Sequence, residues 1–248
     1  TPPAEDFTLF LNARLVPSAH LLPALQSWCN DPQMGVVRSG ESIAAALVHA
    51  KVDETQFTGA DSLEDYLDDQ NLESRELALP LFEYPHEIIK YHLEIFADNL
   101  AHRINRGGYQ ETESQLFLAP AAHIHPSATS DTSGGAIVLE AGATVGPHSH
   151  LRGPVLLGPD TQVLEQSAIK SHTSAGRSCK LGGEISCSII ESYSNKAHHG
   201  FLGHSYLGNW VNLGAGTTNS NLKNTYGEIQ MRYGEDRIAT GMQFVGCI

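Results

Sequence analysis

The sequence is poor in basic residues, in cysteine and in long apolar runs. Its 248 residues include 15 Lys and Arg against 28 Asp and Glu, which gives a formal net charge of −13. Because nucleic acids and anionic membranes bind basic surfaces, we expect neither as a partner. The four cysteines show no CxxC or zinc-finger spacing, no apolar stretch reaches membrane length, and no signal peptide is recognisable. A reducing cytoplasm is therefore the predicted location.

An initiator methionine and a polar C-terminal tail are also missing. The chain begins at Thr1 and ends in the apolar string "GMQFVGCI", a pattern that we interpret as a fragment of a longer protein. The shortage of basic residues is uneven. Residues 1–138 carry 20 acidic and 7 basic side chains, whereas residues 139–223 carry 5 acidic and 6 basic ones. An anionic ligand is therefore expected in the second half.

Residues 1–120 have the pattern of a mixed α/β domain without a phosphate-binding glycine loop. "FTLFLNARL" alternates as a half-buried strand does, and "SAHLLPALQSWC" predicts a helix capped by Ser18. "MGVVRSGESIAAALV" predicts two strands around a Ser-Gly turn. Apolar residues at spacings of four, three and four then predict a connecting helix over 86–105, whose packed face contains Ile89, Leu93, Phe96 and Leu100.

Residues 121–248 contain a six-residue repeat. Nine successive positions at intervals of six hold an apolar residue, namely Leu139, Val145, Leu151, Leu157, Val163, Ile169, Ala175, Leu181 and Cys187. Neither the helical period nor strand alternation produces this interval, whereas hexapeptide repeats do, with three hexads forming each coil of a triangular parallel β-helix. Repeats of this class coil left-handed. The predicted fold is an α/β part followed by a left-handed parallel β-helix.

The repeat slips at "NKAHHG", residues 195–200. In the six-residue frame position 193 is followed by 199, but the apolar pattern resumes eight residues on, at Phe201. Two extra residues at a corner cannot stay in the wall of the prism, so we expect a bulge that carries His198 and His199. An imidazole with a pKa near ~6.5 can act as a general base there. The alternative is a tolerated surface loop.

Two basic residues of the repeat are expected to stack on its outer surface. Lys170 follows Arg152 after three hexads, which is one full coil, and each comes directly after an inward residue of the same face. The strand spacing would hold them about 4.8 Å apart. Two cations this close repel each other unless an anion neutralises them. The spacing favours a phosphate site, with solvated surface charge as the alternative.

The string "KAHHGFLGHSYLGNWVNLGAGTTNSN" resembles the acetyltransferase domain of a bacterial family of bifunctional enzymes. These enzymes combine glucosamine-1-phosphate N-acetyltransferase and UDP-N-acetylglucosamine pyrophosphorylase activities, and "YSNKAH" and "NSNLKN" resemble their alternative, GlmU-like branch. The resemblance implies transfer of an acetyl group from acetyl-CoA to the amine of glucosamine 1-phosphate, a step in UDP-N-acetylglucosamine biosynthesis. It also implies a homotrimer with active sites between neighbouring prisms.

The resemblance implies roles for individual residues. His198 takes the place of the catalytic base when the alignment is anchored on "NLGAG", whereas anchoring on "NKA" places the base at His199. Arg152 and Lys170 match the pair that grips the sugar phosphate. The remaining matches are the substrate-binding residues Phe201, where the bifunctional enzymes have tyrosine, and Asn212, and the cofactor-binding residues Ala215 and Asn221.

Three other functions stay open. In full-length relatives a nucleotidyltransferase domain precedes the prism; "LFLNARLVPS" resembles a segment inside it, so residues 1–120 are interpreted as its remnant. Magnesium is expected only if a nucleotidyltransferase site exists in the full-length protein. His199 and His204 have the ligand spacing of the γ-class carbonic anhydrases, with His172 as a third zinc ligand, whereas acetyl transfer needs no metal. A non-catalytic scaffold is the third alternative.

Overall fold

The computed structural model describes residues 7–30, 33–49, 52, 55, 57 and 59–248. The chain divides into two compact units, Thr1–Glu83 and Tyr84–Ile248. The predicted connecting helix is present as α3 (Glu87–Asn105) and belongs to the second unit. The assignment of residues 1–120 as a domain remnant stays a prediction. Within the described residues, no helix is both long enough and apolar enough to cross a membrane.

The first unit is a small α/β structure, as predicted. Its sheet has the antiparallel order β1-β3-β2, formed by β1 (Phe7–Leu11), β3 (Ser42–His49) and β2 (Gly35–Ser39). Its helices are η1 (Ala19–Leu21), α1 (Leu22–Asn30) and α2 (Ala60–Asp69). Two separate apolar clusters pack on the sheet. Side chains of η1 and α1 belong to one of them, and side chains of α2 belong to the other. Ser18 caps η1, since its hydroxyl accepts a hydrogen bond from the amide of His20.

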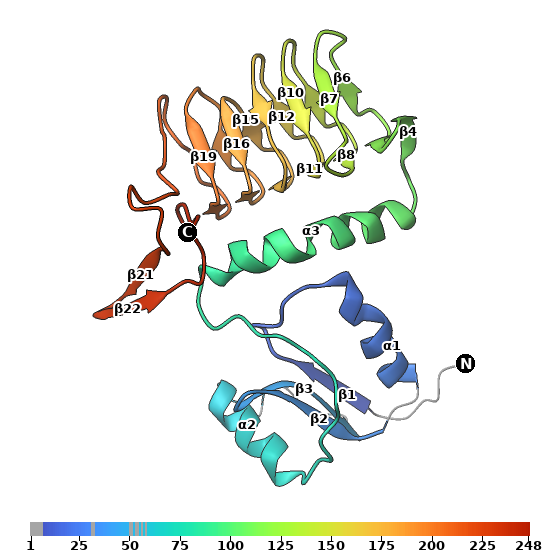
Figure 1. Cartoon of the computed structure of the whole chain (residues 1–248). Helices are drawn as coiled ribbons and strands as arrows, with labels where there is room; N and C mark the ends of the chain where they lie inside the picture. The colour runs from blue at the N-terminus through green and yellow to red at the C-terminus, as the bar shows by residue number, and fades with distance from the viewer. Residues whose placement is uncertain (1–6, 31–32, 50–51, 53–54, 56, 58) are drawn as a thin grey trace. The chain divides into compact units, whose positions relative to one another are not determined.

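The second unit contains stacked coils whose strands form three faces (Figure 1). Face 1 comprises β4 (Gln110–Glu113), β5 (Leu116–Leu118), β8 (Ile137–Leu139), β11 (Val155–Leu157), β14 (Thr173–Ala175), β17 (Ile189–Ile190) and β20 (Tyr206–Leu207). Face 2 comprises β6 (His123–Ile124), β9 (Thr144–Val145), β12 (Gln162–Val163), β15 (Lys180–Leu181) and β18 (Asn195–Lys196). Face 3 comprises β7 (Thr129–Asp131), β10 (His150–Arg152), β13 (Ala168–Ile169), β16 (Glu184–Ser186) and β19 (Phe201–Gly203).

Successive strands of each face pair in parallel, apart from the antiparallel pair β4–β5. The first eight repeat residues, from Leu139 to Leu181, are all nearly inaccessible to solvent and form one continuous core. Each hexad therefore contributes one of these apolar side chains to the interior, which is what the six-residue interval predicts, and the small or β-branched residue four positions further on is buried as well. The predicted fold class, an α/β part followed by a left-handed parallel β-helix, is confirmed.

The predicted frame is wrong beyond Leu181, because the coils shorten there. Parallel pairing sets Lys196 beside Leu181, whereas three full hexads would bring position 199 there. Ile185 is the next inward residue and is fully buried, whereas Cys187 occupies a corner with φ 49°. The interval from Lys196 to the next inward residue, Leu202, is again six, so "NKAHHG" contains no extra residues. The pattern of aliphatic residues does not reveal the register of these later coils, because the inward position at 196 holds a lysine.

Helix α3 lies along face 1 (Figure 1). Phe96 and Leu100 pack on outward-pointing residues of that face, among them Val138 and Leu156. Burying such apolar surface stabilises the contact by roughly 25 cal/mol per Å². Near its C-terminal end, Arg103 Nη1 lies 2.5 Å from Glu140 Oε1, which fixes the helix to the coil. The helix thereby covers face 1 and leaves faces 2 and 3 to carry a site.

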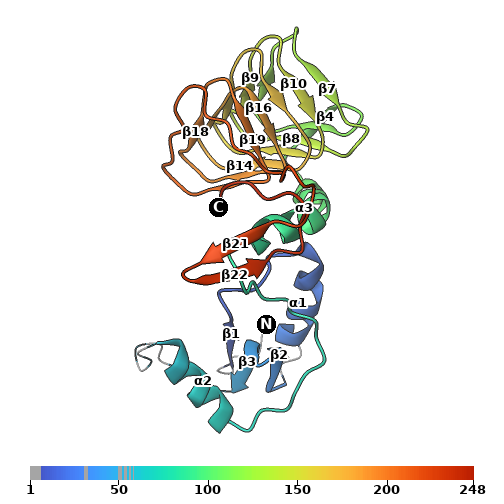
Figure 2. The ribbon, with the colours of Figure 1, turned by 60° about the vertical axis from the view of Figure 1, so that its left-hand side comes forward.

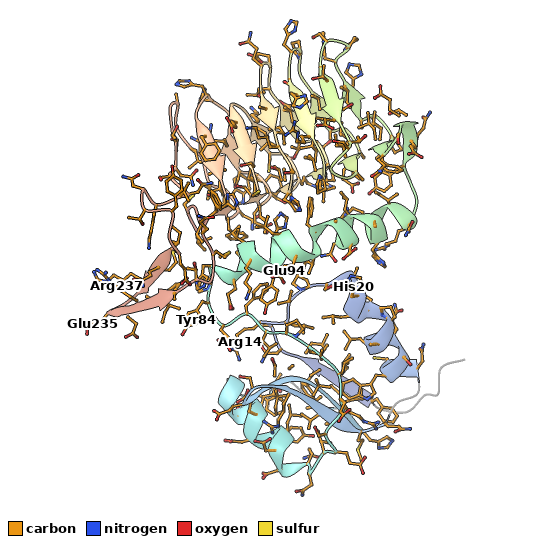
Figure 3. All side chains as sticks on the ribbon, viewed as in Figure 1. Arg14, His20, Tyr84, Glu94, Glu235 and Arg237 are labelled. Atoms are coloured by element: carbon orange, nitrogen blue, oxygen red, sulfur yellow. The ribbon has the colours of Figure 1, made fainter. Side chains whose placement is uncertain are left out.

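A hairpin of β21 (Gln230–Tyr233) and β22 (Asp236–Ala239) leaves the coils after residue 222 (Figure 2). Figure 3 shows Glu235 and Arg237 at its tip and Tyr84 near the start of α3. Tyr233 Oη lies 2.8 Å from His86 Nδ1, so the hairpin is tied to the start of α3. The chain then returns to the coils, where the amide of Tyr206 donates a hydrogen bond of 2.9 Å to the carbonyl of Cys247.

Candidate functional site

The two neighbouring histidines lie in a turn between β18 and β19, at the corner of faces 2 and 3. His198 and His199 are both exposed. The amide of Glu184 donates to Gly200 O at 3.0 Å from the preceding coil, and the amide of Gly216 donates to His199 O at 3.2 Å from the following segment. The turn of residues 197–200, called the histidine turn below, is therefore held on both sides by backbone hydrogen bonds.

Glycines allow this close stacking of backbone. A Cβ added to Gly182 would lie 2.1 Å from the carbonyl oxygen of Ala197. Gly200, with φ 124°, approaches the next segment equally closely, because a Cβ there would lie 2.1 Å from Thr217 O. Any side chain at these positions would push the coils apart. The "LGGE" and "HHG" strings are thus needed by the corner that presents the histidines.

The two imidazoles differ in their surroundings. An ideal Cβ at Gly216 would lie 3.5 Å from His199 Nε2. The His199 ring therefore faces residues 214–216 of the same chain, called the "GAG" segment below. At His198 the contact is made by the backbone, because its carbonyl oxygen accepts a hydrogen bond from Lys196 Nζ. The assignment of the base to His198 stays a prediction, and it is the His199 ring that lies beside the "GAG" segment.

The predicted cation pair lies on face 3, and each cation already has a carboxylate partner. Parallel pairing of β10 with β13 places Arg152 and Lys170 in successive coils, as their one-coil spacing predicts. Arg152 Nε lies 3.0 Å from Asp131 Oδ2, and Lys170 Nζ lies 2.6 Å from Glu184 Oε1. Mutual repulsion therefore does not require an external anion. Hydrogen bonds from Ser133, and then the interaction with Arg152, hold the pKa of Asp131 below its usual value.

The remaining predicted site residues are divided between faces 2 and 3. Phe201 pairs with Glu184 on face 3, next to the Lys170 ion pair. Asn212 lies on face 2, in a bridge to Asn195. A single chain does not bring Asn212 onto the same surface as Phe201 and Lys170, because the corner with the histidine turn separates faces 2 and 3.

The predicted cofactor residues lie after the corner. Ala215 is exposed within the "GAG" segment. Asn221 Nδ2 lies 2.8 Å from His204 Nδ1 and also lines a cavity of about 670 Å³. This cavity opens beside residues 220–225, with Met231 and Val245 in its wall. It is the size of a small-molecule site.

The proposed zinc ligands do not form a cluster. His172 and His204 lie on the corner of faces 3 and 1, whereas His199 lies on the corner of faces 2 and 3. Among the described residues, no three His, Cys, Asp or Glu side chains are grouped so that they could hold a metal ion. The geometry of this chain therefore gives the carbonic-anhydrase alternative no support.

His92 on α3 and the two corner histidines, His172 and His204, are instead fully or partly buried by packing. His92 Nε2 lies 2.9 Å from His172 O, and burial lowers the pKa of His92 to about 4. Burial also lowers the pKa of His172. Burial, and then the charge of His172, lower the pKa of His204. Each of these imidazoles is favoured in its neutral form, which suits the packing of His92 and His172 between α3 and the coils and of His204 against Phe244.

Sequence reasoning missed three charged residues at the site. Asp131 pairs with Arg152 one coil earlier but 21 residues away, because that coil is longer than three hexads, and Glu184 follows Lys170 by 14 residues, so neither interval matches the repeat. Lys196 was missed because inward positions were searched for apolar residues alone. Lysine is rarely buried without a partner, so a lysine beside two histidines at a glycine-rich corner was the available signal.

Comparison with known proteins gives relatives over part of the chain. No protein-family model matches. Proteins named "Bifunctional protein GlmU" from Rippkaea orientalis, Gloeothece citriformis and a Cyanothece species are 40%, 36% and 33% identical to the chain over 85, 85 and 86 residues. The matched stretch covers 34% of this chain and 15% of the length of each relative.

Proposed function

We propose that this chain, which is related to the bifunctional GlmU proteins, carries the N-acetyltransferase part of such an enzyme. It would move the acetyl group of acetyl-CoA to the amine of glucosamine 1-phosphate. The observation that carries the proposal is the histidine turn, a backbone-braced corner that exposes two imidazoles with the "GAG" segment beside them. Such a corner combines a base with backbone amides that can stabilise an oxyanion.

In the proposed reaction His198 takes a proton from the ammonium of the sugar. The free amine then attacks the thioester carbonyl, a C–N bond forms, and the C–S bond breaks as the tetrahedral intermediate collapses. The imidazolium returns its proton to the departing thiolate of coenzyme A, and the new amide nitrogen releases its remaining extra proton to water. The amides of Gly214 and Ala215, in the "GAG" segment close to His199, would bind the oxyanion of the intermediate, since the amide of Gly216 is already bonded to the carbonyl of His199. No step requires a metal ion or a covalent enzyme intermediate.

The sugar phosphate would bind at Arg152 and Lys170. Both side chains are about half exposed, and their partners Asp131 and Glu184 are also accessible to solvent. Exposed ion pairs contribute only about 0–1 kcal/mol, so a phosphate can replace the carboxylates at little cost. Arginine suits this role because its guanidinium binds phosphate through two parallel hydrogen bonds. Phe201, next to Glu184, would pack against the sugar ring.

The division of the site residues between two faces supports a homotrimer. Asn212 on face 2 of one protomer could meet Lys170 and Phe201 on face 3 of its neighbour, whereas one chain cannot bring them together. Acetyl-CoA would bind at Ala215 and Asn221, and the cavity beside Asn221 offers apolar walls together with the Lys223 ammonium. Magnesium belongs to the proposal only through a nucleotidyltransferase site in the full-length protein.

The experiment is acetyl transfer itself. Purified protein is incubated with acetyl-CoA and glucosamine 1-phosphate, and N-acetylglucosamine 1-phosphate is detected by mass spectrometry. Arg152→Ala and Lys170→Ala are expected to raise the KM for the sugar phosphate about tenfold or more. Lys180→Ala, which removes an exposed lysine of face 2, is the matched control. Absence of product would contradict the proposed function.

A further inference from the structure

Lys196 occupies a position where the preceding coils place aliphatic side chains. It pairs with Leu181 on face 2, and none of its surface is accessible to solvent. Burying an ammonium group is costly unless its hydrogen bonds are satisfied, and burial lowers the pKa of Lys196. An aliphatic residue would fill the same space without this cost, so the amine itself requires an explanation.

The ammonium group connects two successive coils through backbone carbonyl groups. Lys196 Nζ donates a hydrogen bond of 3.2 Å to Gly182 O, which lies in the corner of the coil before it. It also donates to His198 O, in the histidine turn. The next two carbonyl groups of that turn, at His199 and Gly200, accept from backbone amides of Gly216 and Glu184. The carbonyl of His198 thus accepts its hydrogen bond from a side chain in the interior, that of Lys196.

We propose that Lys196 is a positioning residue, whose ammonium fixes the histidine turn by holding the carbonyl groups of Gly182 and His198. The bond to the carbonyl of His198 restricts the peptide plane that follows, which sets the directions of the His198 and His199 side chains. A lysine reaches this carbonyl from the interior, whereas an aliphatic side chain of equal length leaves it without that donor. The effect on catalysis rests on the proposed function, and the effect on the turn does not.

Hydrogen exchange tests the structural part without reference to activity. Lys196→Met keeps an unbranched side chain that is one atom shorter and removes the donor. The amides of Glu184 and Gly216, which are bonded to the turn, are expected to exchange about tenfold faster or more in this variant. The amide of Gly158, bonded to Ala175 in an earlier coil, is expected to keep its rate. Lys180→Met is the matched control and should leave all three amides unchanged.

A second variant separates positioning from general stability. Lys196→Gln keeps a donor on a shorter, neutral side chain and is expected to restore part of the protection of Glu184 and Gly216. Unchanged exchange of these amides in Lys196→Met would overturn the proposal. Faster exchange at Gly158 to the same extent, in both variants, would also overturn it, because Lys196 would then support the core as a whole.

Kinetics tests the catalytic part in a protein that acetylates glucosamine 1-phosphate. Lys196→Met is expected to lower kcat about tenfold or more, through misplacement of the base, while the KM for the sugar phosphate stays within about twofold. The KM is preserved because Arg152 and Lys170 lie on face 3, away from this side chain. An unchanged kcat with faster exchange would contradict the catalytic part of this proposal, whereas absence of wild-type activity would reject the proposed function alone.

Discussion

Burial of His92 predicts a specific loss of stability in acid. His92 lies on the inner side of α3, is 8% exposed and is bonded through Nε2 to the carbonyl of His172. Burial lowers its pKa from 6.5 to about 4. In the unfolded chain the imidazole is hydrated and binds a proton near its ordinary pKa. The unfolded state therefore binds more protons than the folded state between these two values, and the free energy of unfolding falls as the pH falls.

The size of this loss of stability follows from the pKa shift of His92. A displacement from 6.5 to about 4 corresponds to about 3.4 kcal/mol once the pH is below both values. At about pH 5 roughly 2 kcal/mol of this loss is already present, and above about pH 7.5 it vanishes because the imidazole is neutral in both states. A loss of about 2 kcal/mol is a large fraction of the stability of an ordinary domain.

Urea unfolding, followed by circular dichroism between about pH 5 and pH 8, measures the effect. His92→Gln retains a side-chain donor toward His172 and removes the titrating group, so its free energy of unfolding should fall by about 2 kcal/mol less than that of the wild type over this range. His102→Gln, at an exposed position of the same helix, controls for the loss of a histidine. If His92→Gln loses stability in acid as steeply as the wild type, the buried neutral state of His92 is wrong.

Other perturbations address the phosphate site and the glycine corner. Glu184→Gln removes the carboxylate that competes for Lys170, so the Kd for glucosamine 1-phosphate, measured by calorimetry, should fall up to about fivefold; a weaker affinity would instead make Glu184 part of the sugar site. Gly182→Ala introduces a Cβ 2.1 Å from Ala197 O and should lower the free energy of unfolding by about 1–3 kcal/mol. Gly208→Ala, where no atom lies within 4 Å of the added Cβ, is its control in the same urea titrations, and equal losses would contradict the close approach.

The coils were predictable because hexapeptide repeats impose one inward residue every six positions. The interval held from Leu139 to Leu181, and every one of those side chains is buried. It failed where the coil shortens, because Ile185 comes four residues after Leu181 and Cys187 turns away at a corner. The shortening is visible in the pairing of Leu181 with Lys196, and the spacing of apolar residues does not report it.

The candidate site was predictable in its basic residues and not in their partners. Arg152 and Lys170 could be placed because one coil separates them. Their carboxylate partners lie in neighbouring coils at intervals that depend on side-chain direction and on coil length, and neither is fixed by the repeat. Lys196 could not be predicted from hydropathy, because a charged residue occupies a fully buried position among aliphatic ones.

The histidine turn as the source of the base is the central claim, and it is tested most directly by the turnover of two single variants. In a protein that acetylates glucosamine 1-phosphate, His198→Ala should lower kcat by roughly 10²-fold or more, and His199→Ala should have the smaller effect. The reverse order would move the base to His199, next to the "GAG" segment. Full activity of both variants would contradict the claim that this turn supplies the base.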